Sequence, residues 1–474
     1  MTVVAALDKK NSQAPLAVKS MLSAVRAPGY RYSLGWRGHV DASLSVEDLP
    51  EPRSSVALGI AEESDAPASG IVSRDRWCAA LEGYLLPGRD TTHGFMEKSP
   101  RRFMEALTGR EGAFSCIAAA EVLTACRDEL GRAPLYAVED ERWLLLATRK
   151  RCIWGNSSRE PEIVPPAKIV RFTGRGTHVS RGHVRWPRHA RTVTLRDAAR
   201  RVANLLLGAV GRWSSGLESS ALAFSGGLDS GLLGHLTRDL VTLRLITVTF
   251  AEGGAHLDQA EKAASILGLP IKLVTPSKSE TEKTLRDVVW SCETDERMSV
   301  ETALPIFCAS RDARDLGFDS ILTGHVADEL FGGYMKYAAL SRDDASVAFQ
   351  RMRADFINLQ RRDLERDFKA CASNSLALRL PYSDTQLARY VLSLPTDLRV
   401  DVDSGARKLV LREAAGLLGC PQQIVDARKK AVQYSTGASK MLRIIAREHN
   451  QPPDLYLREL LRAAKRSARS QSLL

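Results

Sequence analysis

Apolar and polar positions change their spacing near residue 194, which divides the chain into two parts. Before that point, short alternating apolar stretches lie between Gly and Pro turns, which is typical of a β-rich domain with some helices. After it, helical spacing over Leu195–Leu207 is followed by short apolar runs that alternate with amphipathic segments. This alternation predicts an α/β fold whose parallel sheet carries helices on both faces.

The second part of the chain can be divided into individual elements. The predicted strands are 220–224, 245–250, 271–274 and 320–323, a helix is predicted at 258–267, and residues 340–450 are expected to be mainly helical. Ligands of such sheets bind beyond the carboxyl ends of the strands, where Ser225 and Thr323 fall. Residues 156–187 are predicted to be a connecting segment with one edge strand at most, and the tail is expected to fray beyond Arg462.

Composition narrows the class of protein. With 474 residues, 44% hydrophobic and 26% charged, the chain is expected to form two or three globular domains. No apolar run reaches membrane-spanning length and no signal pattern begins the chain, so we expect a cytoplasmic protein without a membrane partner. The eight cysteines form no CxxC pair, so neither a zinc site nor a disulfide framework is indicated.

The net charge of +11 raises the question of a nucleic-acid partner. Basic residues are dispersed along the chain, and the 6% aromatic content includes no basic stretch interleaved with aromatics for base stacking. A solvated basic face is therefore favoured, and a nucleic-acid partner stays open as the lesser alternative. Whether the chain forms a homodimer also stays open.

The strongest chemical signal is a glycine turn between a predicted strand and a helix. The apolar run ending at Phe224 is followed by Ser-Gly-Gly-Leu-Asp-Ser at 225–230 and then by helical spacing. Such a turn binds anions, because backbone N–H groups point outward, the helix dipole favours negative charge and glycine permits close approach. No Gly-Lys-Ser/Thr follows, so this is not a Walker loop. The turn resembles the pyrophosphate loop (PP-loop) of the N-type ATP pyrophosphatases.

A second predicted strand ends in Thr323-Gly324 and leads to the neighbouring carboxylates Asp328 and Glu329. ATP cleavage at the α-phosphate needs Mg²⁺, which prefers oxygen ligands. Asp229 and Asp328 follow two different strands and are the predicted Mg²⁺ ligands. The residues of the two turns predicted to bind the nucleotide are Ser225, Gly226, Gly227, Leu228, Asp229, Ser230, Thr323 and Gly324. The resemblance to PP-loop enzymes implies that Phe224 and Thr249 also bind it, beside the adenosine.

Together the two motifs resemble those of class B asparagine synthetases and their relatives, including β-lactam synthetases. The pattern of that family is Ser-Gly-Gly-Leu-Asp-Ser, then Ser/Thr-Gly-x-Gly-x-Asp-Glu-x-Phe-Gly-Gly-Tyr. The segments 379–384 and 428–434 are also similar to family segments. The sequence of 362–367 is most similar to that of the asparagine-synthetase-domain-containing branch of the family. The resemblance implies an N-terminal αββα glutaminase-like domain of the Ntn type over 1–180, a PP-loop synthetase domain over 190–450 and a basic tail over 451–474.

The glutaminase half departs from the family pattern. The family's catalytic Cys follows the initiator Met, where this chain has Thr2, and a hydroxyl is a poorer nucleophile than a thiol. The family's Asn-Gly-Glu, which holds glutamine and builds the oxyanion hole, aligns with residues 80–82, where only Glu82 is kept. The resemblance therefore implies that glutamine hydrolysis is lost, with a Thr2-dependent amidase as the alternative.

For the synthetase half, the resemblance implies an ATP-dependent, AMP-forming amide ligase that joins ammonia or an amine to a small carboxylate. Lys430 is the candidate for stabilising charge at phosphorus, from its place in the family's lysine segment. His325 stands where asparagine synthetases have an acidic residue and β-lactam synthetases a tyrosine, so it is a candidate base or a pocket wall. With Ala377 in place of a family Glu, this puts aspartate as the substrate in doubt.

Two other functions stay open at this point. One is a tRNA-modifying PP-loop ATP pyrophosphatase, which the basic pI favours and the absence of paired cysteines disfavours. The other is a non-catalytic ATP-binding scaffold, which the retention of the 225–230 turn, Asp328 and Lys430 disfavours.

Overall fold

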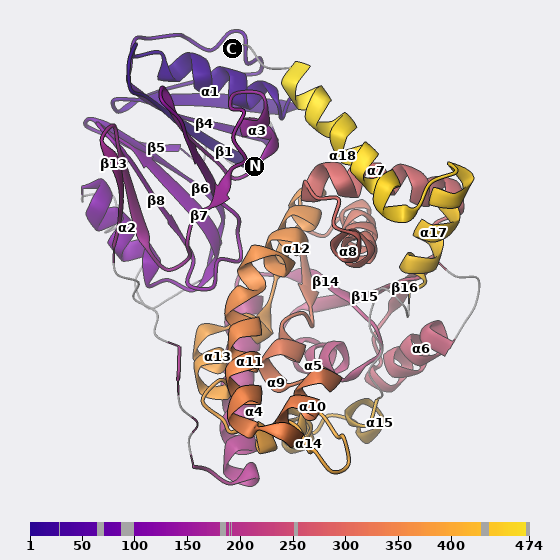
Figure 1. Cartoon of the computed structure of the whole chain (residues 1–474). Helices are drawn as coiled ribbons and strands as arrows, with labels where there is room; N and C mark the ends of the chain where they lie inside the picture. Colours follow the sequence, from indigo (N-terminus) through magenta and orange to yellow (C-terminus); the bar gives the residue numbers. More distant parts are fainter. Residues whose placement is uncertain are drawn as a thin grey trace. The chain divides into compact units, whose positions relative to one another are not determined.

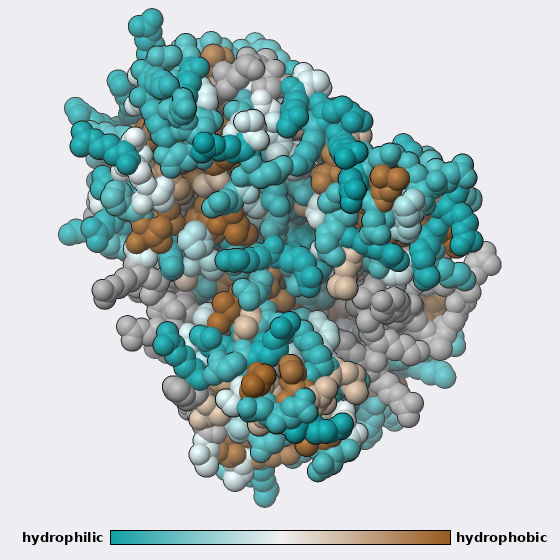
Figure 2. Space-filling model, viewed as in Figure 1, coloured by the Kyte–Doolittle hydropathy of each residue, from teal (hydrophilic) through white to brown (hydrophobic). Residues whose placement is uncertain are grey.

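The structure is a computed structural model that describes residues 1–27, 29–63, 71–86, 99–180, 186–188, 190, 192–250, 255–427 and 436–470. The chain forms two compact units (Figure 1). Unit 1 comprises Met1–Val184, Glu293–Asp295 and Arg458–Leu474, and unit 2 comprises Arg185–Cys292 and Glu296–Leu457. Among the described helices, none is both long and apolar enough to span a membrane. Figure 2 shows a mainly hydrophilic face with small, separate apolar areas.

Unit 1 contains two antiparallel sheets. The first has the order β11-β9-β10-β1-β4-β2-β3, with β1 Thr2–Asp8, β2 Tyr30–Trp36, β3 His39–Ser43, β4 Val56–Glu63, β9 Tyr136–Glu139, β10 Trp143–Ala147 and β11 Glu162–Ile163. The second has the order β13-β12-β8-β7-β6-β5, with β5 Ile71–Arg74, β6 Trp77–Leu85, β7 Gly112–Ala119, β8 Leu123–Arg127, β12 Ile169–Thr173 and β13 Gly176–Val179.

Side-chain alternation along β1 explains how these sheets are layered. Val3 and Ala5 share a core with Ile117 of the second sheet, whereas Val4 belongs to a different core formed with α1 (Ala14–Ser23) and α3 (Arg151–Trp154). The outer face of the second sheet packs against α2 (Pro100–Thr108). The order helix, sheet, sheet, helix confirms the αββα architecture expected for the first half of the chain (Figure 1).

Two sequence expectations for unit 1 are wrong. Residues 156–180 do not merely connect two domains, because they contribute β11, β12 and β13, and β12 lies between β8 and β13. The C-terminal tail does not fray beyond Arg462, because α18 (Pro453–Ser470) continues to Ser470. Ala464 and Ala468 of α18 are buried, and the Lys465 ammonium pairs with Glu160 at 2.5 Å. Tertiary contacts thus maintain a helix whose terminal sequence is strongly basic.

Unit 2 is built on a parallel sheet in the order β16-β15-β14-β17-β18, as the α/β pattern predicts. Its strands are β14 Ser219–Ala223, β15 Thr242–Val248, β16 Ile271–Val274, β17 Ser320–Thr323 and β18 Ala377–Arg379. The predicted strands therefore exist, although β15 begins earlier and ends two residues earlier than expected. The sequence did not indicate β18, whose three residues are too few to show a strand pattern.

The connections of this sheet place a site at its centre. From β14 the chain moves in one direction, through α5 (Leu228–Thr237) to β15 and through α6 (Ala255–Leu267) to β16. It then returns through α7 (Lys278–Cys292) and α8 (Arg297–Asp315) to β17, on the other side of β14. Right-handed crossovers put the two sets of helices on opposite faces. The turns after β14 and β17 therefore meet where the strand order reverses, which is where such sheets bind ligands.

Unit 2 also contains α-helices besides α5, α6, α7 and α8. They are α4 Leu195–Ser214, α9 Ala327–Phe331, α10 Met335–Asp343, α11 Ala345–Asn358, α12 Asp363–Ala372, α13 Thr385–Val391, α14 Leu409–Leu417, α15 Gln422–Val425 and α17 Ala438–Glu448. One buried carboxylate joins two of them: Asp384 accepts hydrogen bonds from the Arg212 guanidinium of α4 and caps the first N–H groups of α13. A bidentate pair of this kind fixes α4 against α13.

Candidate functional site

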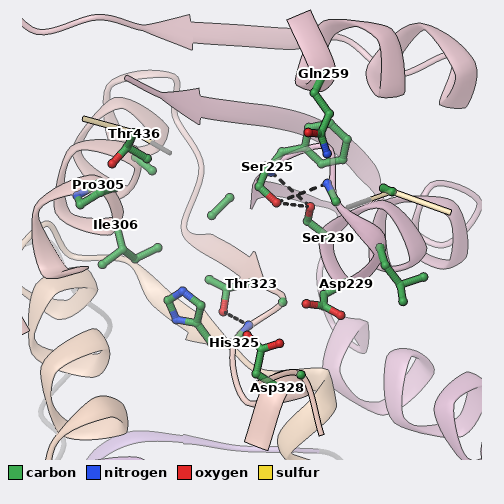
Figure 3. A pocket seen from close by; sticks show the side chains of 18 of the residues that line it. Ser225, Asp229, Ser230, Gln259, Pro305, Ile306, Thr323, His325, Asp328 and Thr436 are labelled. Carbon is green, nitrogen blue, oxygen red and sulfur yellow. Dashed lines mark hydrogen bonds between the residues drawn. The ribbon is translucent and has the colours of Figure 1, made fainter. Parts of the chain in front are cut away.

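The turn after β14 is held by its own serines. The N–H of Ser225 donates to Ser230 Oγ at 3.2 Å, and the two hydroxyl oxygens lie 3.1 Å apart (Figure 3). Gly227, which precedes α5, donates its N–H to Ser225 Oγ at 3.4 Å. These contacts shape the turn without using the first N–H groups of α5. Those groups are the ones that bind phosphate at a helix N-terminus.

Gly226 is required by two features of this turn. Its φ is +68°, a conformation that glycine adopts without steric cost. A Cβ at this position would lie 2.7 Å from the Gln259 carbonyl oxygen and 2.8 Å from the Ala260 Cα, both in α6. The Gln259 side-chain amide also donates to the Gly226 carbonyl at 3.2 Å. The backbone of α6 therefore packs directly against the turn.

The turn after β17 touches the first one. A Cβ on Gly324 would lie 3.0 Å from Asp229 Cβ and 3.2 Å from the Ser230 nitrogen. Two residues later, Val326 adopts φ +77° before α9 begins. This left-handed conformation is rare for a β-branched residue. In the family pattern the same position is a glycine, so the chain keeps the backbone shape of the motif without the residue that suits it.

Asp229 and Asp328 are brought together by a lysine that the sequence did not single out. Lys408 Nζ lies 2.6 and 2.5 Å from the two carboxylate oxygens of Asp229 and 2.7 Å from Asp328 Oδ1. The Lys408 side chain is buried, and burial lowers the pKa of its ammonium, although Asp229 opposes that shift. Lys408 itself has φ +60° at the start of α14.

The same segment supplies further positive charge. Arg407 Nη1 donates to the Gly333 carbonyl at 2.9 Å, and Arg412 Nε donates to the Arg407 carbonyl at 3.0 Å. Arg407, Lys408 and Arg412 all line one cavity. Gly333 is tightly enclosed there, because a Cβ on it would lie 1.9 Å from Asp328 Oδ1. The only sequence signal for Lys408 is its place in a short basic run before a helix.

His325 has an acidic partner that the sequence did not indicate. His325 Nδ1 lies 2.6 Å from Asp367 Oδ2, and Asp367 comes from α12. Burial alone would raise the pKa of the Asp367 carboxyl, but Arg366 and His325 outweigh it and lower this pKa to about 2. Asp367 is therefore ionised at neutral pH and can only accept hydrogen bonds, so Nδ1 of His325 donates.

The cavity is bounded by both turns and by α8 (Figure 3). Its polar lining includes Ser225, Asp229, Ser230, Thr323, His325, Asp328 and Lys408, and its apolar lining includes Phe224, Leu228, Ile246, Val248, Pro305, Ile306 and Ala309. Predicted residues that also line it are Gly227 and Gly324. The apolar residues form a surface against which a planar base could pack, a short distance from the phosphate-binding turn.

Two predicted site residues do not line the cavity, and a third cannot be placed. Gly226 supports the turn from behind, against α6. Thr249 does not flank the cavity as predicted, because it is buried with its N–H donating to the Val274 carbonyl and its hydroxyl to the Thr436 carbonyl. Lys430, the predicted catalytic lysine, lies outside the residues that the structure describes.

The carboxylates fit a magnesium site of the nucleotide-dependent kind. Asp229 and Asp328 already share one cation, the Lys408 ammonium, so their oxygens are close enough to share a metal ion. Among the described residues no group of three or more His, Cys, Asp or Glu side chains could hold a metal by itself. Mg²⁺ commonly uses one or two carboxylates and takes its other ligands from phosphates and water. The residues present are suited to that arrangement.

In unit 1, the position of the family nucleophile is buried. Thr2 is 5% exposed and pairs with Ala61 in the first sheet. Glu82, which aligns with the glutamine-holding Glu of the family, is also buried and forms an ion pair with Arg149 at 2.7 Å. The Arg149 guanidinium therefore occupies one oxygen of this carboxylate.

Comparisons with known proteins agree with the motifs. The sequence profile described as Asparagine synthase matches residues 201–353 and 342–468, more than half of the chain. A Methanocaldococcus jannaschii protein whose name assigns it to the glutamine-hydrolysing asparagine synthetases is 24% identical over 375 residues, 69% of each chain. The asparagine synthetase of Gallus gallus is 29% identical over 229 residues, which span 46% of this chain and only 39% of that protein.

Among solved structures, a glutamine phosphoribosylpyrophosphate amidotransferase from B. subtilis covers 68% of this chain and 81% of its own, at 12% identity and a TM-score of 0.33. A similarity this distant leaves the fold to be argued from the two units themselves.

Proposed function

The chain belongs to the asparagine synthase family, and from this premise we propose that it is an ATP-dependent carbon–nitrogen ligase that forms AMP. In the proposed reaction a substrate carboxylate is adenylated, and ammonia or an amine then displaces AMP to give an amide. We further propose that glutamine is not the nitrogen source.

One observation carries this proposal. The carboxylates of Asp229 and Asp328 follow different strands, yet both lie within 2.7 Å of the same lysine nitrogen beside the 225–230 turn. Two acids, a buried cation and a phosphate-binding turn at the point where strand order reverses are the parts that polyphosphate cleavage requires. A general nucleotide-binding scaffold has no need for this pair of carboxylates.

The first step follows from the lining of the cavity. The adenine packs against the apolar residues of β15 and α8, and the phosphates lie on the N–H groups at the start of α5. An oxygen of the substrate carboxylate attacks the α-phosphorus, and the bond to the bridging oxygen breaks to release pyrophosphate. Arg407, Lys408 and Arg412 stabilise the negative charge that builds on the phosphate oxygens. Asp229 and Asp328 would hold Mg²⁺, which supplies further positive charge when bound.

The second step needs a base. The nitrogen of the donor attacks the activated carbonyl carbon, and AMP leaves with the bonding electron pair. The attacking nitrogen must lose a proton, and we propose that His325 Nε2 takes it, because Nδ1 already donates to Asp367. Lys430 remains a proposed contact to the α-phosphate on the strength of the family resemblance.

The proposed loss of glutaminase activity is supported by two features of unit 1, the residue at the nucleophile position and the ion pair of Glu82. Thr2 replaces a thiol with a hydroxyl, and Glu82 is bonded to Arg149 in place of a substrate. We therefore propose that free ammonia or an amine enters the reaction directly.

The test is product analysis with purified protein. Mg²⁺, ATP and ammonium are supplied together with a panel of carboxylates, and AMP and pyrophosphate are measured. We expect both products in equal amounts with the correct acid, and we expect Asp229→Ala to abolish them. Asp239→Ala is the matched control, because that carboxylate is 83% exposed and lies just after α5. Release of ADP in place of AMP would exclude the proposed reaction.

The nitrogen source is tested separately. Thr2→Ala is expected to leave ammonium-dependent turnover unchanged, and glutamine is expected to support no turnover in the unaltered protein. Glutamine-dependent turnover that disappears in Thr2→Ala would show that the first unit is a working amidase.

A further inference from the structure

The base proposed above is connected to a chain of charges on α12. Asp367 Oδ2 accepts from His325 Nδ1 at 2.6 Å, and its other oxygen accepts from Arg366 Nε at 2.7 Å. Arg366 Nη1 donates in turn to Asp363 Oδ1 at 2.8 Å. Asp363, Arg366 and Asp367 lie one helical turn apart or adjacent on α12, so the helix backbone sets their spacing. Both oxygens of Asp367 are thus held in place.

We propose that Arg366 is a positioning residue of this site, which keeps His325 neutral and its Nε2 free to accept a proton from the amine donor. This inference rests on the proposed function for its role in turnover. Its electrostatic part concerns only His325, Asp367 and Arg366 and can be tested without turnover.

The physical reason is the need to neutralise Asp367. This carboxylate is 1% exposed, and an ionised carboxylate that deep in the protein requires a positive partner. If His325 were the only partner, the imidazole would itself carry the compensating charge and could not accept a proton. Arg366 is 7% exposed and always charged, so it supplies that compensation. His325 is then left as a neutral imidazole with a defined tautomer.

Other charges also act on His325, and their signs differ. Charged groups on the neighbouring elements are Asp229 on α5, Asp328 and Glu329 on α9, Asp363, Arg366 and Asp367 on α12, Arg407 and Lys408 before α14, and Arg412 on α14, while the residues of α8 that line the cavity are uncharged. The acids favour the protonated imidazole and the cations disfavour it. Asp363 shares Arg366 with Asp367, so it weakens the effect of Arg366.

The test follows the protonation of His325 directly by NMR, with its imidazole signal assigned by its absence in His325→Gln. In Arg366→Gln we expect the titration midpoint to rise by about one pH unit, because an opposite charge at this range has been removed. Asp363→Asn should move the midpoint down by a smaller amount, because Arg366 then acts on Asp367 alone. Arg366→Lys keeps the charge and should restore most of the original midpoint.

The control removes a buried cation from the same helix without touching His325. Lys369 is fully buried and pairs with Glu365 at 2.8 Å, so Lys369→Gln should destabilise α12 to a similar degree. Its His325 midpoint should stay unchanged. If Arg366→Gln cannot be folded, Asp363→Asn, whose carboxylate is 28% exposed, tests the same coupling with the opposite sign. An unchanged midpoint in the folded variants, or an equal shift in Lys369→Gln, would overturn the proposal.

Turnover gives the second readout. In the pH profile of kcat/KM for AMP formation, the rise on the acid side should move to higher pH in Arg366→Gln, by the same amount as the NMR midpoint of His325. A merely structural role would lower kcat at every pH without moving the limb, and that result would overturn the proposal. If the unaltered protein forms no AMP while the midpoints shift as expected, the proposed function fails and the coupling of Arg366 to His325 is supported.

Discussion

Lys408 Nζ lies 2.6 and 2.5 Å from the two carboxylate oxygens of Asp229, so a buried ammonium occupies the place between acids where a metal ion would be expected. The same nitrogen is 2.7 Å from Asp328. In this arrangement the lysine neutralises two carboxylates that would otherwise repel each other in a poorly solvated position. The protein can therefore assemble the site before the nucleotide arrives.

This relationship predicts how magnesium affects stability. Lys408→Met removes the cation and leaves the two acids facing each other, so the protein in EDTA should lose several degrees in Tm. Added Mg²⁺ should restore much of that loss, because it replaces the missing charge. In the unaltered protein the same Mg²⁺ should have little effect. The measurement is thermal unfolding without nucleotide, with and without Mg²⁺.

The control for this experiment is Lys440→Met, which removes an exposed lysine at the start of α17. Its Tm should be insensitive to Mg²⁺. An equal response to Mg²⁺ in Lys408→Met and in the unaltered protein would show that Asp229 and Asp328 do not take up the metal when the lysine is removed.

Gly333 offers a test of the cavity that leaves charges intact. A Cβ at this position would lie 1.9 Å from Asp328 Oδ1 and 2.6 Å from Lys408 Cε, so Gly333→Ala must displace the carboxylate. We expect a loss of AMP formation of at least 100-fold, comparable to the loss of a key electrostatic contact. The protein should stay folded, as judged by circular dichroism.

Gly416 in α14 is the matched control, because a Cβ there meets nothing within 4 Å. Gly416→Ala should leave activity unchanged and stabilise the protein by up to about 1 kcal/mol, because alanine favours the helix. Full activity in Gly333→Ala would mean that Asp328 can move without harm and is not needed for turnover.

The central sheet and both turns can be predicted from sequence because their signals are local. The strands at 271–274 and 320–323 begin and end where the apolar runs do. The glycines after β14 and β17 are neighbours of those runs in the chain. Asp229 and Asp328 could therefore be placed at adjacent strand ends by the rule that parallel strands share an edge.

The partners of these residues could not be found in the same way. Lys408 is 179 positions from Asp229, and Asp367 is 42 positions from His325. Lys408 has only a short basic run before a helix to mark it, and Asp367 only its place in the segment 362–367, so neither signal reveals the partner, which depends on contacts in three dimensions. Thr249 shows the opposite error: its position next to a strand end suggested a cavity residue, but its polar groups are taken up by the Val274 and Thr436 carbonyls.

The left-handed backbone conformation of Val326 predicts an unusual order of stability for its glycine and alanine variants. Because its φ is +77°, any residue with a Cβ is strained there, whereas glycine is not. Val326→Ala and Val326→Gly both remove the buried isopropyl group, so they differ mainly in backbone strain. We expect Val326→Gly to be more stable than Val326→Ala by about 1 kcal/mol. Denaturant unfolding of the two variants gives the comparison.

Val347 provides the reference for that comparison, because it is 50% exposed within α11. At an ordinary helical position glycine is about 1 kcal/mol worse than alanine. Val347→Gly should therefore be less stable than Val347→Ala, which is the reverse of the order at Val326. The same order at both positions would show that the turn after β17 relaxes when valine is removed.

Asp367 makes stability depend on pH in a defined window. Burial raises its pKa, but the Arg366 and His325 contributions outweigh burial, so the folded-state pKa is about 2, against an ordinary value of 3.8. A depressed carboxyl pKa contributes stability that is present above the ordinary value and is lost as pH falls through the folded one. A shift of this size corresponds to about 2 kcal/mol, lost progressively between about pH 4 and pH 2.

The measurement is the free energy of unfolding of the unaltered protein and of Asp367→Asn at several pH values. At pH 7 the variant should be less stable, because Arg366 loses a charged partner. As pH falls below about 4, the difference should shrink, because Asp367 binds a proton in the unfolded chain before it does so in the folded one. Asp41→Asn, at an exposed position of β3, should run parallel to the unaltered protein throughout. A constant difference between the unaltered protein and Asp367→Asn over this range would mean that Asp367 is not ionised in the folded protein, and the tautomer assigned to His325 would have to be withdrawn.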